Sequence, residues 1–545
     1  MLVATLAAEV PKDPSKIGDS SGTAVERFLK WVDDEKRREV ALNAAIPLCI
    51  NEDILIQLQG EEEGKALFNW LKEMPFVNER HDGWVYHDVV RTQILRYKRR
   101  LSLQSWAELH GNLAEYYDNL RNSLQLAEDK IWLDETWFRY TLEVTYHRLC
   151  ESPHKYLSVV LNEFLVALKN KRKFAQRFAE RILLAGENLD SAEVERWGEK
   201  LVGGLRAYEE KQYEKAVEMF TALVEHSEIE AKWLPVALSW RGGTYRKMKR
   251  YDDALKDFDR AIEIDLDYAW AFVHRGINYR LMERYEDALK NFDRAIEIDS
   301  DYLFALAQRG IHYRLMECYE DALKDFNCAI EIDPNYKWAI AQRGYTYHLM
   351  KRYDDALKDF NRAIEIDSDY KWAIAQRGYT YRWMKRYEDA LKDFNRAIEI
   401  DLDYTWALAC RGEYYLIVKQ YDEAITDLNR AIELKNSSNW RLYLRALVYK
   451  ALNQPDKAQS DFANAVKFAK LKYDENPQDW QNTLNLALYY LAANYIPTAK
   501  QLYELALSQN ALPGYIRMAI QDLDDFLTVF PEHSEAKAMR KLLGS

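Results

Sequence analysis

Apolar and polar positions along the second half of the chain follow a pattern that repeats every 34 residues. Arg-Gly dipeptides mark the step, and they begin at Arg241, Arg275, Arg309, Arg343, Arg377 and Arg411. The letters of residues 336–347 return unchanged at 370–381. Within each unit the apolar residues recur at intervals of three and four, which is the spacing of one helix face. The pattern therefore predicts helices throughout this half of the chain.

Short polar segments interrupt the helical pattern once in every unit. They read IDSDY or IDPNY, with Asp and Asn as turn residues and a proline at Pro334. Each unit is thus predicted to be two antiparallel helices and a turn, with glycine and alanine where the backbones approach. One such pair cannot bury its own apolar face, so neighbouring pairs are predicted to stack into an all-α solenoid.

This pattern resembles the tetratricopeptide repeat, whose signature places Gly, Tyr, Ala, Phe or Tyr, Ala and Pro at fixed offsets in 34 residues. Units over 235–438 match it strongly, weaker units extend the array to 197–513, and 514–545 is expected to form capping helices. The proline position departs from the signature, since only Pro334 fills it. The resemblance implies a right-handed superhelix with a concave groove, lined by the first helix of each pair.

The resemblance also implies which side chains face the groove. The second position of a unit carries mostly tryptophan, the twelfth mostly arginine, and the ninth carries tyrosine in two units. The candidate partner-binding residues are Trp270, Phe304, Trp338, Trp372, Trp406, Arg246, Arg280, Arg314, Arg382, Tyr345 and Tyr379.

An aromatic column beside a basic column suits a peptide or protein with acidic and apolar or aromatic side chains. Tryptophan gives a large contact area at small entropic cost, and arginine pairs with carboxylates in a fork. The near-identical units also fit a repetitive partner. The alternative is that the tryptophan column packs between adjacent units as core.

The arginines of the Arg-Gly dipeptides have a different predicted role. Aspartates recur sixteen residues after most of them, on the second helix of the unit, at Asp257, Asp325, Asp359, Asp393, Asp427 and Asp461; Asn291 takes this place once. We hypothesise Arg–Asp bridges between the two helices of a unit. Such pairs fix geometry more than they stabilise.

The first 196 residues do not follow the repeat. Helical patterns precede two β-type runs, FVNER and WVYHD, which flank HDG, a hairpin signal. Helices followed by a hairpin are a winged-helix arrangement. We therefore expect an N-terminal segment over 1–23, a winged-helix-like domain over 24–120 and a helical connector over 121–196.

The segment WVYHDVVR resembles the Met-His-Asp motif of STAND-type signalling NTPases, with Tyr86 in place of Met. In those proteins a winged helix and a helical connector follow the nucleotide-binding core. The resemblance implies that His87 contacts a nucleotide phosphate and that Asp88 holds the local turn; an ordinary surface or core histidine is the alternative. An NTPase partner, or a missing N-terminal NTPase domain, is implied as well.

A phosphate-binding loop of the GxxxxGK[ST] type is absent from the sequence. GEEEGKA at 60–66 has too few residues between its glycines, lacks the Ser or Thr for magnesium and packs three acids where phosphate belongs. This chain by itself is therefore not expected to hydrolyse ATP.

Charge argues against nucleic acid as a partner, because the 545 residues carry a formal net charge of −12. Residues 1–200 hold 28 basic and 33 acidic side chains, a net of −5. One cluster is basic, at Arg91, Arg96, Lys98, Arg99 and Arg100. It lies in the helix after the hairpin, away from the expected recognition helix, and is interpreted as a solvated helix face.

The remaining signals exclude several classes. The five cysteines are scattered without a CxxC pair, which favours the reducing cytoplasm and gives no metal site. The apolar start of the chain is expected to be a buried helix end rather than a secretion signal. No run of 18 apolar residues predicts a membrane span. Neither HExxH nor GxSxG occurs, so no catalytic function and no cofactor are expected.

Three function classes remain open. The first is a binding scaffold or sensor for a protein partner, the second the regulatory half of a STAND-type switch, and the third a winged-helix DNA regulator.

Overall fold

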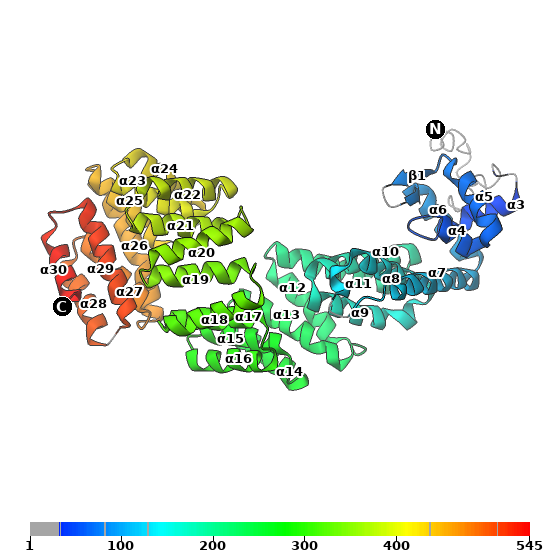
Figure 1. Ribbon diagram of the computed structural model, residues 1–545, viewed down its shortest axis with the longest axis horizontal. Coiled ribbons are helices and arrows are strands. Elements are labelled where there is room, and N and C mark those ends of the chain that lie inside the picture. The colour runs from blue at the N-terminus through cyan, green and yellow to red at the C-terminus, as the bar shows by residue number, and fades with distance from the viewer. Residues whose placement is uncertain are drawn as a thin grey trace, which may run out of the picture. The chain divides into compact units, whose positions relative to one another are not determined.

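The computed structural model describes residue 25, residue 32 and residues 34–544, except for 81–82, 128–129, 435–437 and 510. The expected N-terminal segment 1–23 and the HD of the hairpin turn lie outside the described residues. The chain divides into two compact units after Met282, and each is taken by itself (Figure 1). None of the described helices is long and apolar enough to cross a membrane.

Unit 1 begins with short helices and one hairpin. Their bounds are α3 Glu35–Asn43, α4 Glu52–Gln59, α5 Glu61–Lys72, β1 Val77–Arg80, β2 Gly83–Tyr86 and α6 Asp88–Leu101. The strands pair antiparallel with Val77 opposite Tyr86, and Ile50 adds one further bridge to Trp84. The strands predicted from FVNER and WVYHD are thus present.

Local chemistry explains where these elements start and turn. The Asn51 side chain accepts the Ile54 N–H at 2.8 Å and caps α4. Gly83 has φ 138°, and a Cβ there would lie 2.4 Å from the Cys49 sulfur, so only glycine fits. Tyr86 is buried, and its hydroxyl donates to the Ala41 carbonyl at 2.6 Å, which ties the hairpin to α3.

Longer helices follow in unit 1. Their bounds are α7 Leu103–Ser123, η2 Ile131–Leu133, α8 Glu135–Glu151, α9 Pro153–Asn170, α10 Arg172–Leu189, α11 Ala192–Glu209, α12 Tyr213–Glu225, η3 Ala231–Trp233, α13 Leu234–Lys247, α14 Tyr251–Ile264 and α15 Ala269–Leu281. The helices α10 and α11 approach closely through Gly186 and Gly198. A Cβ on Gly198 would lie 2.4 Å from the Leu183 Cα.

Replacing Gly198 by alanine is expected to destabilise unit 1 by about 1–3 kcal/mol, because the two helix backbones must separate. The matched control is Gly203→Ala on the same helix, where a Cβ meets nothing within 4 Å. That change is expected to stabilise by up to about 1 kcal/mol through helix propensity. Urea midpoints measure both, and equal shifts for the two variants would contradict the close approach.

Unit 2 consists of helical hairpins followed by two further helices. The bounds are α16 Tyr285–Ile298, α17 Leu303–Leu315, α18 Tyr319–Ile332, α19 Lys337–Leu349, α20 Tyr353–Ile366, α21 Lys371–Trp383, α22 Tyr387–Ile400, α23 Thr405–Ile417, α24 Tyr421–Leu434, α25 Asn439–Ala451, α26 Pro455–Glu475, α27 Trp480–Ala492, α28 Ile496–Ser508, α29 Pro513–Val529 and α30 Ser534–Leu543. The predicted all-α solenoid of paired helices is therefore confirmed, and Figure 1 shows the hairpins side by side.

The hairpin core follows the columns read from the sequence. Ala356, Phe360 and Ala363 have no exposed surface, and the Phe360 ring lies 3.1 Å from the place of a Cβ on Gly344. Between hairpins the Asp367 carboxylate accepts the Asp369 N–H at 3.1 Å, which is the turn predicted from IDSDY.

Arginine–aspartate bridges join the helices, as hypothesised from the sixteen-residue spacing. Arg343 donates to both oxygens of Asp359 at 2.7 and 2.8 Å. Equivalent pairs join Arg241 to Asp257, Arg309 to Asp325, Arg377 to Asp393, Arg411 to Asp427 and Arg445 to Asp461. The third nitrogen of Arg343 donates to Asn327 on α18 at 2.7 Å. One guanidinium therefore ties its own hairpin and the preceding one.

The expected capping region does more than end the stack. Helix α29 packs against α27 and α23, which are first helices of their pairs. At its start, the Gly514 N–H donates to Glu317 at 3.0 Å, and Arg517 lies 3.5 Å from the same carboxylate. Helix α29 thus reaches across the first helices to the turn between α17 and α18.

Candidate functional site

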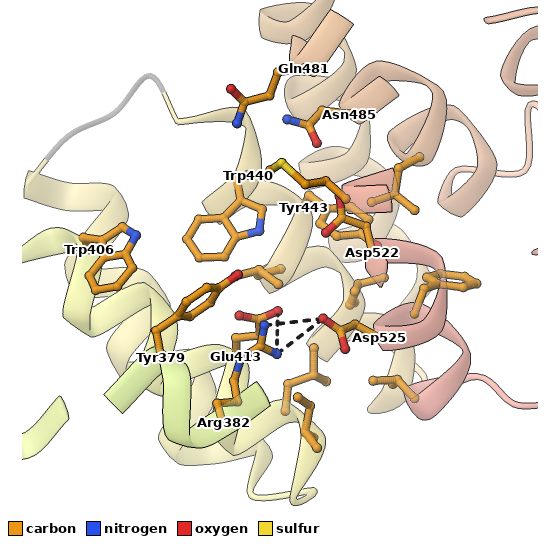
Figure 2. Close-up of a pocket in the computed structure, with 18 of the residues that line it drawn as sticks. Tyr379, Arg382, Trp406, Glu413, Trp440, Tyr443, Gln481, Asn485, Asp522 and Asp525 are labelled. Carbon is orange, nitrogen blue, oxygen red and sulfur yellow. Dashed lines mark hydrogen bonds and ion pairs between the residues drawn. The ribbon is translucent and has the colours of Figure 1, made fainter. Parts of the chain in front are cut away.

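A cavity of about 350 Å³ opens in unit 2 between the first helices and α29 (Figure 2). Its size falls in the range of ligand pockets in proteins. Helices α19, α21, α23, α25 and α27 each contribute side chains to it, as does α29. Stacking of near-identical hairpins places the same helix position of successive units side by side, so the cavity collects residues 34 apart.

Aromatic side chains form one wall of the cavity. The rings of Tyr379 and Trp406 lie 5.8 Å apart, and Trp440 and Tyr443 stand next to them in Figure 2. Trp406 and Trp440 are half-buried. Their exposed parts leave apolar and π surface available to a ligand.

The floor of the cavity is a cluster of ionisable groups. Arg382 on α21 is buried, 3.3 Å from Glu413 on α23 and 3.4 Å from Asp525 on α29. Asp522, one turn earlier on α29, lies beside them (Figure 2). Burial raises the pKa of Glu413 to about 7, with opposition from Arg382. Burial, together with Asp525 and Glu413, raises the pKa of Asp522 to about 7.

The raised pKa of Asp522 predicts how the folding stability of unit 2 depends on pH. The folded state keeps this proton up to about pH 7, whereas an unfolded aspartate loses it near its ordinary value of 3.8. Folding stability from this group therefore falls as pH rises through that window. We expect Asp522→Asn to raise the melting temperature relative to the unmodified chain more at about pH 8 than at about pH 5.

Thermal unfolding at both pH values measures the difference. Asp524→Asn, on the same helix and paired with Arg540 at the surface, is the control and should show little pH dependence. A parallel response of the two variants would contradict the raised pKa of Asp522.

The structure brings only part of the predicted site together. Tyr345, Tyr379, Arg382 and Trp406 all line the cavity. The other aromatic candidates of unit 2 pack along the core: Trp338 stacks on Phe304 with centroids 5.8 Å apart, and Trp372 meets the Phe360 ring edge-on at 6.5 Å. Part of the tryptophan column therefore packs in the core between units and does not face a ligand.

The predicted basic column makes contacts within the protein. Arg314 donates to Gln342 at 3.1 Å and lies over the Tyr345 ring at 4.6 Å. Burial lowers the pKa of Arg314. Arg382 is held by carboxylates, so the cavity has an acidic floor where a basic face was expected.

In unit 1 the remaining candidates lie on α13 and α15. The Arg246 guanidinium donates to the His274 carbonyl at 3.0 Å. The Trp270 ring lies 3.6 Å from the His274 ring and stacks on Trp240 at 6.1 Å. Arg280 lies in the last turn of α15.

The cavity residues outside the candidate set include Glu413, Trp440, Asp522 and Asp525. Glu413 occupies the ninth position of its unit, the position that Tyr345 and Tyr379 hold in the two preceding units. This change from tyrosine to glutamate is the sequence signal that could have identified it. Trp440 continues the tryptophan column. Asp522 and Asp525 belong to the non-repeating end, and no periodicity marks them.

The N-terminal candidates lie at the start of α6. His87 and Asp88 are both exposed, and the His87 N–H donates to the Phe76 carbonyl at 2.8 Å. Two members of the basic cluster turn inward: Arg91 donates to the Ile46 carbonyl at 3.1 Å, and Lys98 donates to Asn43. Burial lowers the pKa of Lys98 to about 8. The cluster is therefore partly used in packing α6 against α3.

Comparison with protein-family models identifies the repeats. Models of the tetratricopeptide repeat family match residues 233–301, 304–336, 338–370, 372–404 and 411–438. No curated protein matches the chain.

Three of the similar solved structures share low sequence identity with this chain. A tetratricopeptide repeat protein from Parabacteroides merdae is 18% identical over 43% of this chain and 93% of that chain, with TM-score 0.37. Pseudomonas aeruginosa pilF is 16% identical over 40% of this chain and 98% of that chain, with TM-score 0.34. YrrB, described as a repeat protein with an unusual peptide-binding site, is 25% identical over 36% of this chain and 98% of that chain, with TM-score 0.27.

The family matches fall on the hairpins from α13 to α24 and share their 34-residue step. The helical hairpins within residues 233–438 are therefore tetratricopeptide repeats.

Proposed function

We propose that unit 2 is a non-enzymatic scaffold or sensor that binds a polypeptide partner in the cavity on its first helices. Tetratricopeptide repeat proteins are in general protein-interaction scaffolds, which gives the class. The observation that carries the proposal is the cavity itself, walled by half-buried Trp406 and Trp440. Large aromatic side chains in a partly open pocket are typical anchors of protein interfaces.

Helix α29 supports this proposal from within the molecule. Its residues Met518, Asp522 and Phe526 line the cavity together with the repeats, so an amphipathic helix already rests on this face. Seating of a helix on an apolar groove is a recurring mode of peptide recognition. A partner segment would enter the space that α29 leaves open beside Trp406 and Trp440.

The test is selection of binding peptides from a random display library on the full chain. Trp406→Ala and Trp440→Ala are each expected to weaken the selected peptides at least about tenfold. Leu402→Ala is the matched control, since Leu402 is 72% exposed in the turn just before α23 and outside the cavity. Circular dichroism checks the fold of each variant. Selected peptides that bind all three variants equally would refute the cavity as the site.

A second candidate function rests on the order of elements in unit 1. Helix α3, the Ile50 bridge, helices α4 and α5, strands β1 and β2 and helix α6 follow one another in the order of a winged helix. We propose such a domain over residues 24–120, a connector over 121–196, a repeat array over 197–513 and a cap over 514–545. In this reading the chain is the sensor half of a STAND-type switch, with His87 and Asp88 near the nucleotide of an NTPase partner.

Nucleotide contact separates the two candidates. Cross-linking of radiolabelled ATP to the chain in the presence of a purified NTPase partner, with His87→Ala as the matched variant, tests the switch. Equal labelling of the unmodified chain and the His87→Ala variant would contradict the switch, and only the scaffold function would then remain.

A further inference from the structure

We propose that the cavity binds the side chain of a lysine or arginine presented by a polypeptide. This inference rests on the proposed function and specifies the chemistry of its partner. The repeat columns alone predict an acidic partner, whereas this inference predicts a basic one.

The charge balance of the cavity is the first argument. Among the described residues that line it, the cationic side chain is Arg382, and the carboxylates are Glu413, Asp522 and Asp525. Glu413 and Asp525 already form the ion pairs of Arg382, and Asp522 lies outside those pairs in Figure 2. The lining thus holds two more carboxyl groups than cations, and a positive charge placed among them would favour their ionised forms. A lysine or arginine side chain supplies such a charge.

An unused hydrogen-bond acceptor is the second and independent argument. Glu413 is only 8% exposed, and its Oε2 has no hydrogen-bond partner among the residues that the structure describes. Its other oxygen, Oε1, is the atom that meets Arg382. A buried carboxylate oxygen without a donor is costly in a folded protein and marks a place where a partner belongs. An ammonium or guanidinium group carries the donors that this oxygen lacks.

The aromatic wall selects the same ligand. Tryptophan and tyrosine faces attract cations, tryptophan most strongly, and the apolar stem of lysine or arginine packs well on such rings. Trp406, Trp440 and Tyr379 lie together on one side of Glu413 and Asp525 (Figure 2). An acidic side chain on the same path would meet like charge at the floor of the cavity.

The polypeptide source is favoured by two amide side chains of the cavity. Gln481 and Asn485 on α27 line it and lie beyond Trp440, away from the Arg382 cluster, in Figure 2. Side-chain amides offer both donors and acceptors, which is what a peptide backbone needs on either side of an inserted side chain. A free polyamine has no backbone amides to use them.

The experiment uses the peptides selected on the full chain for the proposed function. The expected result is enrichment of lysine or arginine at one position of those peptides. Replacement of that residue by norleucine is expected to weaken binding to the unmodified chain about tenfold, measured by fluorescence anisotropy. In the Glu413→Gln/Asp522→Asn variant the same replacement should change affinity less than about twofold. Glu504→Gln, an exposed acid of α28, is the control and keeps the tenfold effect.

The outcomes separate the two proposals. Peptides that depend on Trp406 but show no basic preference would overturn this inference and leave the proposed function standing. Absence of any Trp406-dependent peptide would overturn both. Displacement of the peptide by spermidine at equal concentration would overturn the polypeptide source. If the double variant does not fold, Asp522→Asn alone is used, since Asp522 is only half-buried.

The affinity for the basic peptide should also depend on pH. An incoming cation favours the ionised forms of Glu413 and Asp522, whose pKa values burial raises to about 7, so affinity should rise from about pH 6 to about pH 8. The titratable groups that face them include Arg382, Asp525, Cys410, Tyr379, Tyr443, Tyr489 and Tyr503. Burial raises the pKa of Cys410 and of the tyrosines, so they keep their charge state over this range. A flat pH profile would contradict the role of the two carboxyls.

Discussion

Asp359→Ala is expected to lower the free energy of unfolding of unit 2 by about 3 kcal/mol, the lower end of the range for buried ion pairs. The change leaves the Arg343 guanidinium, 18% exposed, without its two-oxygen acceptor. In the part of the chain that the structure describes, Arg343 then keeps its hydrogen bond to Asn327 on the preceding hairpin. Burying an uncompensated charge is what makes the loss large, since the intact pair itself contributes little.

The matched control lies on the same helix. Asp355 pairs at the surface with Arg352 and Lys358, and Asp355→Ala should cost less than about 1 kcal/mol. Chemical denaturation gives both values. Equal costs for the two substitutions would contradict a structural role of the bridges. Arg343 lies outside the cavity, so Arg343→Met should leave peptide affinity intact in folded protein.

Arg382→Leu is expected to release α29 from the repeats at about pH 8, at a cost of about 3–5 kcal/mol. The variant leaves buried Glu413 and half-buried Asp522 and Asp525 side by side without the counter-charge of Arg382. At about pH 5 the effect should be smaller, because Glu413 and Asp522, with pKa values near 7, are then protonated.

Limited proteolysis within Pro513–Val529 at the two pH values reports the release. Arg386→Leu serves as the control, because Arg386 is half-exposed and pairs only at the surface with Asp389. Faster cleavage is expected for Arg382→Leu alone. Equal protection of α29 in both variants would contradict the anchoring role of Arg382.

The repeating half of the fold could be predicted because its physics is local and periodic. The Phe360 and Ala356 columns specify which helix faces meet, and the sixteen-residue spacing specifies that Arg343 meets Asp359. The link from Arg343 to Asn327 follows from the same register, sixteen residues in the other direction, and could have been found the same way.

The candidate site was harder to predict because the residues that contact one another in it are distant in sequence. The sequence predicts that a basic residue at the position of Arg382 faces a ligand, since such a charge is hard to bury alone. Its partner Asp525 lies 143 residues further on, in a helix that carries no repeat signature. Only the path of α29 across the first helices brings the two together, and no periodicity in the sequence encodes that path.

The central claim is that a polypeptide binds in the cavity between the first helices and α29. Hydrogen exchange of the full chain, with and without the best selected peptide, tests it directly. We expect added protection in α23, α25 and α29 and unchanged exchange in the outward helices α24 and α26. Protection confined to other elements, or none at saturating peptide, would contradict the claim.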